Sequence, residues 1–169
     1  MSIEIKRLPL GIAVTNCYIV GDTESNEAIL IDPVDNASLL QEVAQNAGWE
    51  IRLILATHGH YDHVLVSQEL KTLTGAKFYI HHNTPQIAQP DQLTGFLAQL
   101  FPPVAAPDHL IGDESESISL GAIQLETLYT LGHAPDHVCY FLREHKILFG
   151  GDCLFAGSIG RTDFPFCDH

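Results

Sequence analysis

The residues best able to do chemistry stand together at positions 57–63, where the sequence THGHYDH holds three imidazoles and one carboxylate. In an extended segment alternate side chains share a face, so His58 and His60 converge and Asp62 can join them, while His63 points elsewhere. Imidazole and carboxylate together suit zinc, iron, manganese or cobalt, and the lack of a nearby cysteine argues against a sulfur-rich structural zinc site. The alternative is a histidine-rich surface loop that binds nothing. The density of donors favours a metal site, with room for two neighbouring ions.

Two later segments add one donor each, His133 within LGHAP and Asp152 within GGD. Each follows a predicted strand, and loops at strand ends collect functional groups in layered folds. Taken alone, His133 could be a core histidine with satisfied hydrogen bonds, and Asp152 could be a turn or helix cap. Together with residues 57–63 they extend the candidate metal site.

The elements that must position these groups form two similar series of strands and helices along the chain. Apolar, β-branched runs predict strands at 3–8, 13–20, 27–31, 51–56, 77–80, 118–120, 123–130, 138–143 and 146–149. Helical spacing predicts a helix over 37–47, capped by Asp35 or Asn36, and another over 64–73, closed by Gly75. The run 51–56 is apolar except at Arg52, a pattern typical of a strand covered on both faces, and it leads directly into the histidine-rich loop.

The connection over 85–107 holds five of the nine prolines and is either a lid over a functional site or a surface loop with one short helix. The acidic run at 113–116 predicts a solvated turn.

Composition predicts one soluble domain over residues 1–169, because 46% of the residues are hydrophobic and only 17% are charged. The formal charge of −13 argues against nucleic acid and anionic membrane surfaces as partners. No apolar run has the length of a membrane span, and the stretch 8–20 is too interrupted for a signal peptide, so a cytoplasmic location is expected. The four cysteines form no Cys-x-x-Cys pair and are expected to be reduced, most of them in the core.

The sequence HGHYDH at 58–63 matches the His-x-His-x-Asp-His signature of the metallo-β-lactamase superfamily, and the chain resembles that family over almost its whole length. NCY at 16–18, IDP at 31–33 and GDCLFAGSIGRTDF at 151–164 are similar to the glyoxalase II (hydroxyacylglutathione hydrolase) branch, especially its short bacterial form. The resemblance implies an α/β (α+β) fold, the αββα sandwich, in which two mixed sheets lie between outer helices and the metals bind at one edge.

The resemblance also implies the ligands: one ion bound by His58, His60 and His133, and a second bound by Asp62 and His63. Asp152 would bridge the two ions, and Asp62 would be a catalytic residue. The expected cofactor is Zn²⁺, one or two ions per chain, with iron or manganese as alternatives. A metal-bound hydroxide would then attack the carbonyl of a small-molecule thioester of glutathione. The Thr57 hydroxyl and Asp32 are candidates for orienting the ligands.

Two departures from the family pattern matter. The family takes its last ligand from a Gly-His-Gly segment beyond the Gly-Arg-Thr-Asp motif, and this sequence stops at His169. The expectation is therefore a C-terminally truncated domain that lacks the final strands and helices and is one ligand short at its second site. Arg161 occupies the basic position that holds glutathione, and a substrate-binding role competes with an ordinary ion pair to one of the many carboxylates. Asp163 stands where the family often has tyrosine.

Other functions remain open at this stage. Persulfide dioxygenation by a single iron would need only His58, His133 and Asp152, and the GRTDF motif resembles that enzyme class too. A metal-binding remnant without turnover is the non-enzymatic alternative. The oligomeric state, the acyl group and the thiol of the substrate are not determined by the sequence.

Overall fold

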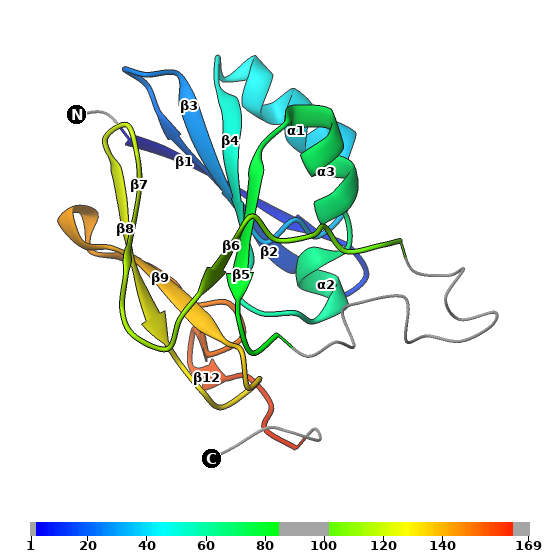
Figure 1. Cartoon of the computed structure of the whole chain (residues 1–169), viewed down its shortest axis with the longest axis vertical. Helices are drawn as coiled ribbons and strands as arrows, with labels where there is room; N and C mark the ends of the chain where they lie inside the picture. Colours follow the sequence, from blue (N-terminus) through cyan, green and yellow to red (C-terminus); the bar gives the residue numbers. More distant parts are fainter. Residues whose placement is uncertain (1–2, 85–101, 164–169) are drawn as a thin grey trace.

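The computed structural model describes residues 3–84 and 102–163, and its larger sheet joins an antiparallel half to a parallel half (Figure 1). Its six strands lie in chain order: β1 (Ile3–Leu10), β2 (Thr15–Asp22), β3 (Glu27–Ile31), β4 (Glu50–Leu55), β5 (Lys77–His81) and β6 (His109–Ile111). Short turns make β1, β2 and β3 antiparallel, whereas longer crossovers make β3 to β6 parallel. The carboxyl ends of β4, β5 and β6 therefore meet at one edge.

The smaller sheet is antiparallel throughout, with the order β10 (Ile147–Phe149), β9 (Val138–Leu142), β8 (Ile123–Tyr129) and β7 (Ser117–Leu120). The tight connections explain this arrangement. Gly121, with φ of 54°, lies between β7 and β8, and the 3-10 turn Arg143–His145 lies between β9 and β10. A two-stranded hairpin follows, formed by β11 (Leu154–Phe155) and β12 (Ser158–Ile159). One of the two expected mixed sheets is thus wholly antiparallel in the described residues.

Three helices are described: α1 (Ala37–Asn46), α2 (Tyr61–Val64) and α3 (Ser67–Thr74). Asn36 caps α1 by accepting the N–H of Leu39, which confirms one of the two predicted caps. The single helix predicted over 64–73 is instead split into α2 and α3. Val66 leaves the helical conformation there, and its N–H is hydrogen-bonded to the carbonyl of Pro33. In the described part of the chain, no helix has the length and apolarity needed to cross a membrane.

Alternating residues of the large sheet divide the core into two layers. Ile19, Leu30 and Ile54 belong to the cluster that packs under α1 and α3. Ile29 and Leu55 point to the other face, where they pack against the small sheet. Figure 1 shows α1 and α3 on the side of the large sheet opposite β7, β8 and β9. Leu53, Ile54 and Leu55 of β4 are buried, as expected for a strand covered on both faces, but Arg52 interrupts the predicted apolar run and is exposed.

Direct hydrogen bonds join the two sheets at both ends of the sandwich. The hydroxyl of Tyr140 donates to the carbonyl of Ala56 at 2.6 Å, and the N–H of Val138 donates to the carbonyl of Thr57 at 2.8 Å. At the far end, the buried carboxylate of Asp22 accepts the N–H of Ala122 at 2.9 Å. The first two bonds fix the ends of β4 and β9 against each other at the edge where the predicted site residues lie.

The connection predicted over 85–107 lies mostly outside the described residues, and 102–107 contain no helix or strand. Of the acidic run predicted at 113–116 as a solvated turn, residues 113–115 are exposed, whereas Glu116 is half-buried and contacts His109 at 2.9 Å. Cys17 and Cys139 are buried and Cys153 is partly exposed, and all three thiols are free.

Candidate metal centre

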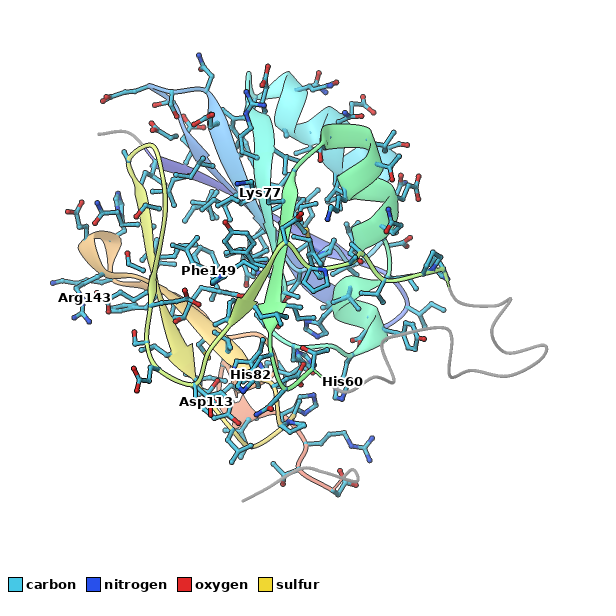
Figure 2. All side chains as sticks on the ribbon, viewed as in Figure 1. His60, Lys77, His82, Asp113, Arg143 and Phe149 are labelled. Atoms are coloured by element: carbon cyan, nitrogen blue, oxygen red, sulfur yellow. The ribbon has the colours of Figure 1, made fainter. Side chains whose placement is uncertain are left out.

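Three loops bring the predicted donors together at one edge of the sandwich. The loop after β4 carries His58 and His60, and α2 directly after it carries His63. The loop after β8 carries His133, and the turn after β10 carries Asp152. Figure 2 shows His60 toward the lower end of the molecule, away from Lys77 at the start of β5. Strands of both sheets thus end in the same place.

Three imidazole nitrogens of the first group face one another. Nδ1 of His60 lies 2.9 Å from Nε2 of His58 and 3.0 Å from Nε2 of His133. Both contacts share Nδ1 of His60, and this nitrogen can form only one hydrogen bond between rings at a time. In the other contact, two nitrogen lone pairs therefore face each other. Such an arrangement is unfavourable unless a cation lies among the three nitrogens.

The outer hydrogen bonds of the rings fix which nitrogen faces inward. Nδ1 of His133 donates to the carbonyl of Arg161 at 2.8 Å, which leaves its Nε2 without a proton. Nδ1 of His58 lies 3.1 Å from the Thr57 hydroxyl, which itself donates to Asp32 and therefore accepts from His58. Both inward Nε2 atoms are consequently lone-pair donors, as metal ligation requires.

Burial and neighbouring rings keep His58 and His60 neutral. Burial, followed by the nearby His63 and His137 rings, holds the pKa of His58 well below its ordinary value. Burial and the adjacent His133 ring likewise lower the pKa of His60. Neutral imidazoles are the protonation state that binds a divalent ion, so the first group fits such an ion in number, geometry and charge.

The second group is centred on the buried ring of His63. Its Nδ1 lies 3.0 Å from Asp32, which also accepts the Thr57 N–H at 2.7 Å. Its Nε2 makes no hydrogen bond with any described residue, although a carboxylate oxygen of Asp152 lies 3.3 Å away. Burial lowers the pKa of His63, but the charges and close contacts of the Asp32 and Asp152 carboxylates outweigh burial and raise the pKa to about 10. A cation is therefore favoured here, either a proton or a metal ion.

Asp152 stands between the two groups. One carboxylate oxygen lies 3.3 Å from Nε2 of His63 and the other lies 3.5 Å from Nε2 of His133. The side chain is 27% exposed, so it borders solvent. This position matches the bridging role that the family resemblance implies for Asp152.

Asp62 does not join the three imidazoles, because α2 begins at Tyr61 and ends the extended segment. One of its oxygens accepts the Thr15 hydroxyl at 2.9 Å and lies 3.7 Å from Nε2 of His63. Strand-like alternation beyond His60 is therefore the wrong geometry for Asp62. Its place beside His63 agrees with the ligand pair that the resemblance implies.

Two supporting residues were not singled out in the sequence. His137 is buried, and its Nε2 accepts the N–H of Asp152 at 3.1 Å. Burial, then the charge of His133, lower the pKa of His137 to about 3, so the ring is neutral and able to accept. Asp136 accepts the N–H of Gly59 at 2.8 Å and so fixes the histidine loop. The one sequence signal that could have identified His137 is its type and position, a second histidine four residues after His133.

A cavity of about 480 Å³ opens beside the second group. Thr15, Asn16 and Tyr18 of β2 form one wall, and the apolar Leu154 and Phe155 form another. The donors Asp62, His63 and Asp152 also line it. A small molecule in this cavity would lie directly against the carboxylates and the imidazole.

Arg161 lies at the edge of the centre, and its backbone and its side chain make different contacts. Its carbonyl accepts from His133, whereas its guanidinium makes two contacts of 2.7 Å with the carboxylate of Asp163. The side chain is 57% exposed and is not among the residues that line the cavity. The predicted substrate-binding role of Arg161 therefore stays a prediction, with the ion pair present alongside it.

A third histidine and aspartate group lies beyond β5 and β6, where Figure 2 labels His82 and Asp113. Nε2 of the buried His81 lies 3.1 Å from Asp113. Nδ1 of His81 accepts the N–H of Asn83 at 3.2 Å, so Nε2 carries the ring proton. That tautomer suits a carboxylate neighbour and opposes metal binding at Nε2.

Replacing Gly160 with alanine should weaken metal binding at least about 10-fold, because ligand geometry tolerates little displacement. A Cβ at Gly160 would overlap the carbonyl oxygen of Asp152 and approach Cγ of His133 to 3.2 Å. Gly112→Ala is the matched control, since its Cβ would meet no atom closer than 4.0 Å. Zinc affinity is measured by competition with a chromophoric chelator. Equal affinities in the two variants would contradict the placement of Asp152 and His133 as ligands.

Comparison with known proteins shows which families and folds the chain resembles. A family model described as "Metallo-beta-lactamase superfamily" matches residues 10–169. The hydroxyacylglutathione hydrolase GloC of Haemophilus influenzae is 34% identical over 177 residues, which cover 100% of this chain and 79% of that protein. The mitochondrial persulfide dioxygenase ETHE1 of Homo sapiens is 33% identical over 155 residues, which cover 90% of this chain and 53% of that protein.

Solved structures show the same fold. The crystal structure of the B3 metallo-beta-lactamase BLEG-1 superposes with a TM-score of 0.83 at 30% identity, covering 98% of this chain and 80% of that one. The structure of TTHA1623 in a di-iron-bound form superposes with a TM-score of 0.77 at 32% identity, covering 96% of this chain and 79% of that one. The expected αββα sandwich is thereby confirmed as the fold class.

Proposed function

The chain belongs to the metallo-beta-lactamase superfamily, and we propose that it is a metal-dependent hydrolase that cleaves a glutathione-type thioester. The observation that carries the proposal is the place of Asp152, whose two oxygens face His63 and His133 in different donor groups. Paired sites that share a carboxylate suit hydrolysis, because two neighbouring ions can act on one water and one carbonyl. The similarity to GloC, over the whole of this chain, supports the same activity.

The proposal assigns each metal ligand to one of two ions or to both. His58, His60 and His133 would hold one ion, His63 and Asp62 a second, and Asp152 would contact both. Bound divalent ions of this kind lower the pKa of water and polarise a carbonyl oxygen. Zinc is the proposed metal, with iron or manganese as alternatives, since imidazole and carboxylate donors accept all three.

The chain's own residues prepare the site before any ion arrives. Asp32 holds the Nδ1 proton of His63, so Nε2 of that ring faces Asp152. The cavity beside Asp62 and His63 gives a substrate carbonyl access to this side of the centre. Its apolar wall at Leu154 and Phe155 would exclude water from part of the bound thioester. Arg161 is proposed as an outer contact for glutathione, reached by exchange of its Asp163 partner.

Persulfide dioxygenation is the second candidate, and the similarity to ETHE1 favours it. His58, His133 and Asp152 supply two imidazoles and a carboxylate, the donor set of non-haem iron oxygenases. This candidate needs one ion and leaves His63 and Asp62 without a role in metal binding.

Metal analysis with two assays separates the candidates. The purified chain, loaded separately with zinc and with iron(II), is assayed for S-lactoylglutathione hydrolysis and for oxygen uptake with glutathione persulfide. Hydrolysis is the expected result, with one ion held firmly by the first group and a second held more weakly by the three described donors Asp62, His63 and Asp152. Oxygen uptake with one iron and no hydrolysis would replace the proposal with the dioxygenase. Ion binding without either activity would leave only a metal-binding protein.

A further inference from the structure

The turn after β10 brings Cys153 next to the thiol of Cys139. Cys139 lies on β9, and its Sγ is 3.6 Å from the carbonyl of Gly150. The N–H of Cys153 donates to that same carbonyl at 3.0 Å, which closes the turn 150–153. The Cys139 thiol and the Cys153 backbone, fourteen positions apart, therefore contact the same carbonyl oxygen, which brings the two residues close together.

The surroundings of the two thiols differ. Cys139 is buried, and its Sγ also lies 3.4 Å from the Thr130 hydroxyl, whereas Cys153 is partly exposed. Burial chiefly, with a hydrogen-bonding contact from the Cys153 thiol, raises the pKa of Cys139 to about 11. A soluble reagent can therefore reach Cys153 first, and Cys139 can react only with a group that Cys153 presents to it.

We propose that Cys139 and Cys153 form a redox modification site, a dithiol that closes to a disulfide on reaction with a low-molecular-weight disulfide such as oxidised glutathione. The Cys153 thiolate attacks one sulfur of the reagent, forming a mixed disulfide and releasing one small thiolate, which takes up a proton. The Cys139 thiol then loses its proton and attacks the Cys153 sulfur, forming the protein disulfide and releasing the second small thiol. The protein dithiol is oxidised by two electrons and one reagent disulfide is reduced to two thiols.

Closure has a structural consequence because the two partners differ in rigidity. Cys139 is on a strand that pairs with β8 on one side and β10 on the other. Cys153 lies on a turn, so the turn must move when the sulfurs approach to the bonded distance of about 2.0 Å. Asp152 directly precedes Cys153, and metal ligands tolerate displacements of only about 0.2 Å. The disulfide form should therefore bind zinc at least about 10-fold more weakly than the dithiol form.

The test incubates the full chain with oxidised glutathione, traps free thiols with N-ethylmaleimide and maps the peptides by mass spectrometry. A linked peptide pair that contains Cys139 and Cys153, lighter by two hydrogen atoms than the separate peptides, is the expected product. In Cys139→Ser the reaction should stop at glutathione attached to Cys153. Cys167→Ser is the matched control, which removes a thiol outside the pair and should still close.

Two results would overturn the proposal. A wild-type chain that accumulates glutathione on Cys153 while Cys139 remains alkylatable would show that the thiols do not meet. A disulfide from Cys153 to Cys17 or Cys167 would assign the modification to another pair. Zinc affinity of the oxidised and reduced chains, compared by chelator competition, tests the link to Asp152, and equal affinities would exclude that link.

Discussion

Asp152→Ala should remove most of the metal from both donor groups and lower thioester hydrolysis by at least about 100-fold, since even the loss of a ligand's supporting contact costs about 10- to 100-fold. The physical reason is that this carboxylate is the one described anionic side chain whose oxygens face both His63 and His133. Its removal leaves the first group with imidazoles alone and takes a negative charge away from each proposed ion. The measurement is metal content by elemental analysis after dialysis, together with the hydrolysis rate.

Two variants make the Asp152 result specific. Asp113→Ala removes an exposed carboxylate from the third histidine and aspartate group and should leave metal content unchanged. His133→Ala removes a donor from the first group only, so one ion should be lost and the second retained in part. Full metal content in Asp152→Ala would refute the shared role, and metal loss in Asp113→Ala would show that the third group also binds an ion.

Asp32→Ala should lower the free energy of unfolding of the metal-free chain by about 3 kcal/mol, the low end for breaking a buried charged pair. For a chain of this size the melting temperature should fall by about 6–12 °C. Asp32 directly follows β3, with a backbone φ of 58°. Its side chain is buried and accepts hydrogen bonds from the Thr57 backbone, the Thr57 hydroxyl and His63. Thermal unfolding is followed by circular dichroism in the presence of a chelator.

Asp22→Ala is the matched control for Asp32→Ala. Asp22 is equally buried and accepts from Glu24, Ser25 and Ala122, but it lies at the opposite end of the sandwich. Both variants should be less stable than the wild type, whereas only Asp32→Ala should also weaken zinc binding. Loss of zinc affinity in both variants would mean that general destabilisation, and not the positioning of His63, explains the effect.

Most of the regular structure was predictable because the apolar pattern follows the burial of the strands. The run at 27–31 coincides with β3, and the helix over 37–47 differs from α1 by one residue. The short strands β6, β11 and β12 were not predicted because none of them has three consecutive apolar residues, whereas β10, which is ILF, was predicted. The break at Val66 depends on the Pro33 carbonyl, a partner that lies far away in the sequence.

The candidate site was predictable in its composition and less so in its geometry. Residue type and spacing pointed to His58 and His60, and position after a predicted strand pointed to His133 and Asp152. The family resemblance added the division of the ligands between two ions. The direction of Asp62 was misjudged from spacing alone, because the start of α2 depends on the fold of the loop. The contributions of His137 and Asp136 are contacts between separate loops, which no local pattern contains.

Ion binding is linked to the kinetics of unfolding, because the metal ligands come from both sheets and the two sheets are joined by hydrogen bonds. β1 to β3 and β7 to β10 are each built from local antiparallel pairs and can form separately, but the donors meet only after the two sheets dock. An ion that binds the docked state alone adds about 2.7 kcal/mol when its free concentration is a hundred times its dissociation constant. Because these contacts form last, that energy slows unfolding and leaves the folding rate nearly unchanged, so the lifetime of the native chain follows the free metal concentration.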